Sequence, residues 1–226
     1  MFLINIQMPI LISFKKSTKK DKKYTMVFRN PTRTLHFGSK TSKTFTEGGS
    51  EEKKKAYLKR HRVNEDWTKI NAGSASRFIL WGDSRSVEKN LQDYMKRFKI
   101  EDARKIPKQY IPESLSDKDL EKQVKSIKEE KGRPKVESFK SKRSGFVKEF
   151  EEKYKTKISD FDFIEKNILK KEGIKQILNK GIGAYYSSGS RPNQTPTSWS
   201  RARLASVIMN GPARKIDKKI WEKYKI

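Results

Sequence analysis

Charged residues run through the whole of this chain, and apolar residues occur only in short, separate stretches. Lys and Arg number 54 against 27 Asp and Glu, which gives a formal net charge of +27, and only 33% of the residues are hydrophobic. A chain of 226 residues with this composition cannot build a large core. Its 24 Phe, Tyr and Trp residues (12, 8 and 4) still distinguish it from a disordered polyelectrolyte. We therefore expect one medium domain or two small ones, and an anionic partner.

The first part of the chain, residues 1–23, is an apolar stretch followed by a cluster of lysines. The apolar portion, 1–14, is shorter than the roughly 20 residues that a membrane-spanning helix needs. The lysines follow the apolar residues instead of preceding them, unlike in a secretory signal. Apolar and polar residues alternate, which predicts an extended docking arm formed by Phe2, Ile4, Ile6 and Met8. A frayed terminus and interfacial attachment to a membrane are the alternatives.

Residues 24–99 carry the pattern of a small α+β domain. Two β-rich runs around an Asn-Pro turn at 30–31 predict a hairpin. Ser50 is followed by Glu and then by Lys and Arg, which predicts a capped helix whose charges suit its dipole. The apolar run 78–81 is the expected core. A further helix over 86–99 has one apolar face, which should pack onto the hairpin.

Residues 100–157 are dominated by charge and predict a basic helical connector. Ser116 with Asp119 three residues later is typical of a helix start. The apolar stripe of that helix, over 120–127, is only one residue wide, and a second narrow stripe follows over 146–154. Such helices need a surface to lie on, which is either a partner protein or their own domains.

Residues 158–226 predict a small helical C-terminal domain around a loop rich in Gly, Ser and Pro, 181–199. Short helices precede the loop, and Ser198 is expected to cap the helix that follows it. Backbone N–H groups and hydroxyls around Arg191 are what an anion-binding nest requires. The alternative is a rigid loop in which Arg191 bonds to backbone carbonyls. The candidate anion or partner contacts are Ser187, Ser188, Ser190, Arg191, Arg201 and Arg203.

The sequence lacks the residue patterns of common catalytic and metal sites. It has no Cys, and its two histidines, His36 and His61, stand far apart. A serine nucleophile elbow is absent, and Asp160 with Asp162 more simply serve the dipole of a helix. We therefore predict no catalytic residue, no metal site and no cofactor, and an enzyme is the least favoured class.

Together these segments predict an α+β, mostly helical fold. Its expected parts are an N-terminal arm over 1–23, a small hairpin and helix domain over 24–99, a basic helical connector over 100–157 and a small helical domain over 158–226.

Two ordered sets of motifs carry a resemblance to known families. The first set is His36-Phe-Gly38, Ala56-Tyr-Leu-Lys-Arg-His61 and the run from Ala72 to Trp81. The second set is the run from Tyr185 to Thr195 together with Ala202-Arg-Leu-Ala-Ser206. The two sets resemble two domains of unknown function found in proteins of giant, nucleocytoplasmic large DNA viruses, over about 24–99 and 105–226. The resemblance implies a viral source and assigns no catalytic or binding residue.

The expected function is that of a structural component of a large DNA virus particle. As a minor capsid protein it would dock on major and other minor capsid proteins through the apolar arm and basic helices. It would lie at the inner face of the capsid in the virion, near inner-membrane headgroups, and in the host cytoplasm during assembly. The alternative is a protein that packs or tethers viral DNA without reading its sequence, because Lys dominates and the positive charge is spread along the chain.

Overall fold

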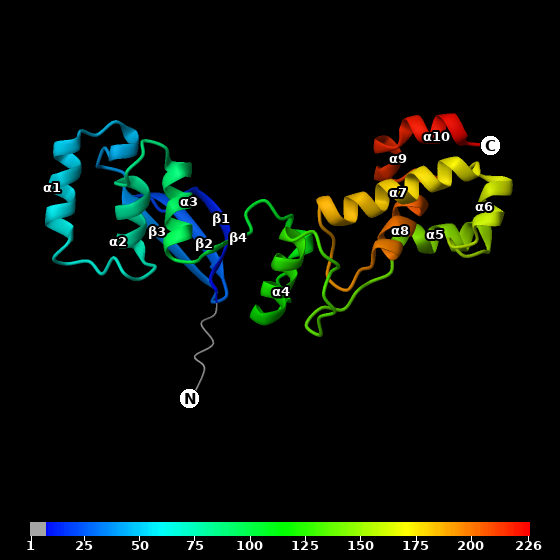
Figure 1. Ribbon diagram of the computed structural model, residues 1–226, viewed down its shortest axis with the longest axis horizontal. Helices are drawn as coiled ribbons and strands as arrows, with labels where there is room; N and C mark the ends of the chain where they lie inside the picture. The colour runs from blue at the N-terminus through cyan, green and yellow to red at the C-terminus, as the bar shows by residue number, and fades with distance from the viewer. Residues whose placement is uncertain (1–7) are drawn as a thin grey trace. The chain divides into compact units, whose positions relative to one another are not determined.

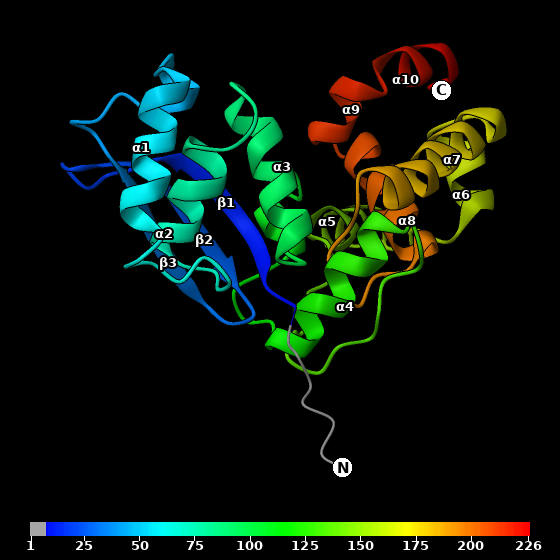
Figure 2. The same ribbon diagram turned by 60° about the vertical axis from the view of Figure 1, so that its left-hand side comes forward.

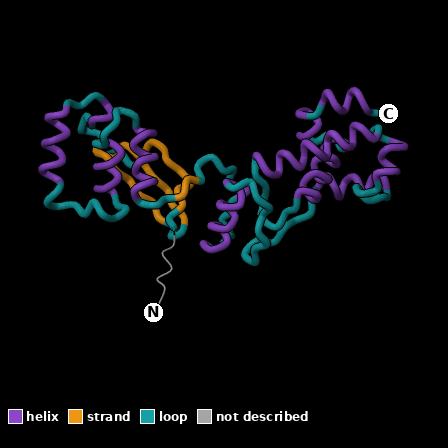
Figure 3. The backbone as a smooth tube through the Cα atoms, in the orientation of Figure 1, coloured by secondary structure: helices purple, strands orange, loops and turns teal. Residues whose placement is uncertain are grey.

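The computed structural model describes residues 8–226, which form two compact units (Figure 1). The first unit extends to Lys105, and the second comprises Ile106–Ile226. All strands drawn belong to the first unit, and the second is built from helices and loops (Figure 3). The expected α+β, mostly helical fold is therefore confirmed. The division differs from the expected one, because the described part of 1–23 belongs to the first unit and 106–157 to the second.

A four-stranded sheet organises the first unit. Strand β2 pairs antiparallel with both β1 and β3, and β4 pairs parallel with β1. The predicted hairpin is confirmed as β2 and β3, and alternate residues of β2, Met26 and Phe28, are fully buried. In the order β3-β2-β1-β4, the strands are β3 (Arg33–Ser39), β2 (Lys22–Arg29), β1 (Ile10–Lys16) and β4 (Glu101–Asp102).

Strand β1 corrects the expectation of an N-terminal arm over 1–23 that is separate from the small domain after it. Ile10 and Leu11 are fully buried, and β1 lies between β2 and β4 in the sheet. At Ile10 and Leu11, pairing on both sides satisfies the backbone, and the fold removes these apolar side chains from water. Met8 precedes the strand, and its carbonyl accepts a hydrogen bond from Asn30 Nδ2 at 3.2 Å. The other residues predicted to form a docking arm lie outside the described residues: Phe2, Ile4 and Ile6.

Helices of the first unit pack over one face of this sheet (Figure 2). Ser50 and Ser86 cap the two longest helices, each accepting a hydrogen bond from the backbone N–H three residues later. Ile79 and Leu80 are fully buried, so the predicted core run is confirmed. The helices are a 3₁₀ turn (Phe45–Glu47), α1 (Glu51–His61), α2 (Ala72–Ala75), a π-helical turn (Ser76–Leu80) and α3 (Val87–Arg97).

The second unit is a group of helices in which α7 packs along α8 and α5 packs against α8. Its narrow apolar stripes are not left exposed, because Leu120, Val124 and Phe150 are fully buried. The elements are a 3₁₀ turn (Lys108–Tyr110), α4 (Asp117–Lys128), α5 (Gly145–Tyr154), α6 (Phe161–Asn167), α7 (Lys171–Ser187), α8 (Pro196–Ile208), α9 (Pro212–Ile216) and α10 (Lys218–Tyr224).

Helices α7 and α8 leave a shorter loop between them than expected. The helix predicted to end at Gly181 continues to Ser187. A Cβ at Gly181 would lie 2.6 Å from the Cα of Ser200, so glycine here permits the close approach of α7 to α8 instead of ending a helix. Thr195, not Ser198, caps α8, and the two residues form a reciprocal capping pair. The connection between the helices is therefore 188–195.

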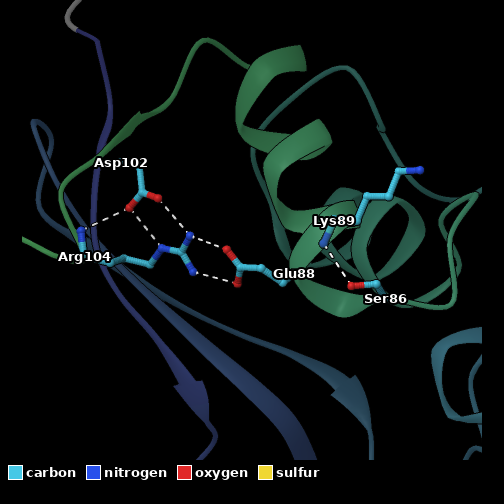
Figure 4. A network of polar contacts seen from close by, with 5 residues as sticks. All are labelled: Ser86, Glu88, Lys89, Asp102 and Arg104. Carbon is cyan, nitrogen blue, oxygen red and sulfur yellow. Dashed lines mark hydrogen bonds and ion pairs between the residues drawn. The ribbon is translucent and has the colours of Figure 1, made fainter.

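In the first unit, Arg104 joins strand β4 to helix α3 (Figure 4). Its guanidinium donates to both carboxylate oxygens of Asp102, at 2.9 and 2.8 Å, and to both oxygens of Glu88, at 3.0 and 2.7 Å. The hydrogen bonds from Arg104 lower the pKa of the Glu88 carboxyl. Paired hydrogen bonds to two carboxylates hold the chain where it leaves the sheet.

We predict that Arg104→Ala lowers the free energy of unfolding by about 1 kcal/mol at neutral pH, because two carboxylates lose a bidentate partner. The pKa of Glu88 is lowered in the folded state, so its contribution is present above the ordinary carboxyl pKa and is lost as the pH falls through the lowered value. Urea denaturation at neutral and acidic pH measures both effects. The control is Lys89→Ala, an exposed neighbour on α3 (Figure 4). Equal losses in the two variants would contradict the prediction.

Candidate anion-binding site

The structure places the residues of the predicted Gly/Ser anion nest in different settings. Ser187 is the last residue of α7, and its hydroxyl donates to the carbonyl of Gly183 at 3.0 Å. Ser190 is fully buried, whereas Ser188 and Arg191 are exposed. None of these four predicted contacts lines the cavity described below.

Side chains from other segments hold the loop 188–195 in place. Gln123 of α4 is fully buried and donates from Nε2 to the carbonyl of Ser190 at 2.9 Å. Asn193 adopts a left-handed conformation, with φ of 60°, which asparagine tolerates better than most residues. Its Nδ2 donates to the carbonyls of Val136 and Phe139, at 2.9 and 2.7 Å. The loop is therefore a fixed connection, in agreement with the rigid alternative.

The role predicted for Arg191, binding of backbone carbonyls, is performed beside this loop by Arg133. Only 8% of Arg133 is exposed, and its guanidinium donates to the carbonyls of Ser126 and Tyr185 at 2.9 and 2.7 Å. Its Cζ also lies 4.8 Å from the centroid of the Tyr185 ring. Burial lowers the pKa of Arg133, but a guanidinium remains charged. Sequence reasoning missed this residue because it lies among many exposed charges, with only a flanking glycine and proline as a signal.

A cavity of about 430 Å³ lies between segments 141–147, 157–159 and 193–202 of the second unit. Its ionisable lining is mainly positive, with four cations and one carboxylate: Lys142, Arg143, Lys157, Arg201 and Glu151. Hydroxyl groups line it as well: Ser141, Ser144, Ser159, Thr195 and Ser198. Because the segment 193–202 is distant in the sequence from the residues of 141–159 that it faces, no local motif indicates this cavity.

Several polar side chains that line the cavity bind one another. Arg143 forms an ion pair with Glu151, the one carboxylate in the lining. Gln194 donates to the hydroxyl of Ser141 at 3.2 Å. Within the described residues, the buried Nε of Arg201 has no hydrogen-bond partner. An excess of cations with neutral donors between them suits a phosphate group.

Arg203, two residues after Arg201 on α8, has a structural role instead. Its Nε and Nη2 donate to Asp217 at 2.7 and 2.9 Å, and Lys180 Nζ lies 2.7 Å from the same carboxylate. Burial tends to raise the pKa of Asp217, but the hydrogen bonds from Arg203 and Lys180 outweigh it and keep the pKa below its usual value. Of the predicted contacts, Arg201 alone lines the cavity.

The available chemistry is recognition of an anion and not coordination of a metal ion. The single carboxylate of the cavity, Glu151, is already in an ion pair. Over the described range 8–226, no three His, Asp or Glu side chains come together as metal ligands. Over the same range, no helix is both long enough and apolar enough to cross a membrane.

We predict that Asp217→Asn lowers the free energy of unfolding by about 3 kcal/mol at neutral pH, because it leaves the half-buried Arg203 without its counter-charge. The folded-state pKa of Asp217 is lowered, so its stabilisation is present above the unfolded pKa and lost as the pH falls through the folded value. The difference between the wild type and the variant should therefore shrink in acid. Thermal unfolding at several pH values tests this, with the exposed Asp162→Asn as control. A difference that stays constant with pH would refute the assignment.

Two protein families match the chain. The family of unknown function DUF5754 matches residues 12–61, in the first unit. The family of unknown function DUF5824 matches residues 107–220, half of the chain, and this range includes every segment that lines the cavity. No curated protein and no solved structure matches the chain. The chain thus joins two families in one polypeptide, and it belongs to the family of unknown function DUF5824.

Proposed function

We propose that the chain binds nucleic acid through the phosphate backbone, without reading base sequence, as a structural component of the particle of a large DNA virus. The observation that carries this proposal is the cavity of the second unit, where four cations and five hydroxyls line one space with a single carboxylate. Phosphodiester oxygens accept hydrogen bonds from these groups, and lysine and arginine neutralise their charge.

Helix α4 adds a second basic surface to this unit. Lys118, Lys122 and Lys125 are exposed and recur at helical spacing, while Leu120 and Val124 of the same helix are buried. Lysine is a flexible point charge, which suits contact with a backbone more than bidentate recognition of a base. The net charge of +27 supports binding by counterion release.

Docking on capsid proteins has less support than contact with nucleic acid. The stripes that favoured docking are packed, and β1 occupies the middle of a sheet. The large apolar side chains that the described residues expose are few: Val63, Ile182, Ile216 and Ile226. We therefore place the protein at the inner face of the capsid, with viral DNA as its main partner and major and minor capsid proteins as further ones. The viral setting rests on the resemblance of its two domains.

The double variant Lys142→Gln/Lys157→Gln tests the cavity. We expect its affinity for a random-sequence DNA duplex to fall about tenfold at low salt, because two phosphate contacts are lost. The slope of log affinity against log salt should decrease by about 2 for the same reason. Fluorescence anisotropy with a labelled duplex at several salt concentrations gives both numbers, and a second unrelated sequence should bind equally well.

The matched control is Lys118→Gln/Lys125→Gln, which removes the same charge from the exposed face of α4. It should weaken binding by less than the cavity variant. An equal loss of DNA affinity in the two variants would show that binding depends on total charge alone and that the cavity is not the binding site. Failure of the wild type to bind DNA at low salt would reject the proposed function altogether.

Fractionation of purified particles tests the proposed location. Recovery with the DNA core, and release by nuclease or high salt, is the expected result. Recovery with the shell after nuclease treatment would favour the minor capsid role instead.

A further inference from the structure

A second cavity, of about 370 Å³, lies within the first unit and is independent of the site just described. It is lined by the end of β3, the loop after it, helix α1 and the segments around Gly73 and Trp81. The segments that carry the two histidines of the chain, His36 and His61, both line this one space, although they are far apart in the sequence. The motifs that carried the first resemblance therefore meet at a single place.

The ring of His61 is held in a defined orientation by a carboxylate. Its Nδ1 lies 2.8 Å from Glu65 Oε1, and Trp67 Nε1 donates to Glu65 Oε2 at 2.8 Å. A carboxylate only accepts, so the hydrogen of this bond belongs to His61 Nδ1, and Nε2 is the nitrogen left for a ligand. A Cβ at Gly73 would lie 2.7 Å from Glu65 Oε2, so glycine is needed there for the carboxylate to keep its position.

An aromatic stack also holds the ring of His61. The centroid of the Tyr57 ring lies 4.2 Å from that of His61 and 4.5 Å from that of Trp81, and Tyr57 is stacked between them. Both faces of Tyr57 are covered, so a planar ligand cannot stack on it. Burial raises the pKa of the Tyr57 phenol, which keeps this group neutral. The stack therefore serves as a rigid wall of the cavity, not as a platform for a base.

The ring of His36 lies on the other face of the sheet. His36 pairs with Thr25 across β3 and β2, whereas Met26 and Phe37 of the alternate positions belong to the core beneath the helices. On that other face, Ser17 Oγ and Thr25 Oγ1 each lie 2.9 Å from His36 Nδ1. The imidazole that faces the cavity is therefore that of His61, on α1.

Two permanent cations, Lys22 and Arg60, complete the lining, together with the hydroxyls of Ser39, Ser42 and Ser76. Arg60 is exposed on α1, and Lys22 is 3.1 Å from the exposed Asp21. The one carboxylate of the lining, Glu65, is already bound by His61 and Trp67. The groups that remain for a ligand are therefore donors and cations.

We propose that this cavity binds a phosphate monoester. A monoester carries up to two negative charges and presents three terminal oxygens, which match two cations and the oriented imidazole of His61 with hydroxyls beside them. The cavity volume lies in the range of small-molecule sites and leaves room for the group that bears the phosphate. A free phosphorylated small molecule and the 5′-phosphate of a nucleic acid strand share this chemistry.

Nuclear magnetic resonance of the full chain tests the proposal, because the imidazole Cε1–H signal of His61 reports on this cavity and that of His36 reports on the other face of the sheet. At constant pH, inorganic phosphate and adenosine 5′-monophosphate should each shift the His61 signal to saturation, whereas adenosine should not. A His61 signal that moves with neither phosphate, or that moves no more than the His36 signal, would overturn the proposal.

Two variants of α1 provide a matched comparison. Arg60→Ala removes a cation of the cavity, and Arg62→Ala removes an exposed cation that does not line it. The first should weaken phosphate binding about tenfold, because a charge-assisted hydrogen bond is lost, and the second should leave it unchanged within about twofold. Equal effects of the two variants would show non-specific attraction and refute the site.

Oligonucleotides separate the two sources of the monoester. Tighter binding of a 5′-phosphorylated strand than of adenosine 5′-monophosphate indicates a strand end, and the reverse order indicates a small molecule. Equal shifts with a 5′-hydroxyl strand would mean that the site takes backbone diesters, against the proposal. The Lys142→Gln/Lys157→Gln variant should keep the His61 shift, so failure of one site is distinguishable from failure of the other.

Discussion

Within each unit, arginine side chains that bind backbone carbonyls and carboxylates join segments of the chain that the small hydrophobic core alone does not hold together. In the first unit, Arg85 donates to the carbonyls of Phe45 and Gly49 at 2.8 and 2.7 Å and covers the Phe45 ring. In the second unit, the guanidinium of Arg133 donates to the carbonyls of Ser126 and Tyr185, and its backbone N–H donates to the Tyr185 hydroxyl. Arg133 thereby joins its own loop to α4 and α7. A guanidinium has five donors in a rigid plane, so one residue fixes several segments. A chain with one third hydrophobic residues depends on such links.

This use of arginine divides the positive charge into two classes. Arg104 and Arg203 are neutralised by carboxylates within the fold and contribute to stability. The exposed lysines of α4 and other cations around the two cavities, such as Lys142, Lys157 and Arg60, remain available for a partner. The net charge of the chain is therefore larger than the charge that is available to bind a ligand. The arrangement of the available cations supports binding of phosphate.

Several local signals in the sequence were reliable, although those at Gly181 and Ser198 were not. The hairpin, the helix over 86–99 and the caps at Ser50 and Ser116 were predicted, because turn residues and capping hydroxyls act within a few residues of themselves. An extended segment near the start of the chain was also expected. The strands that pair with this segment were not predicted, because they come from residues 22–29 and 101–102. Strand pairing between distant segments leaves no local pattern.

The sequence by itself determined the mostly helical α+β class, the basic character and the short elements, since all of these follow from composition and local periodicity. Tertiary structure alone decided which cations are internal and which line a cavity. Arg201 and Arg203 are two residues apart on one helix, yet one lines a cavity and the other binds the buried Asp217. Which of them is free to meet an anion depends on the packing of α8 against distant segments, which neighbouring residues in the sequence do not specify.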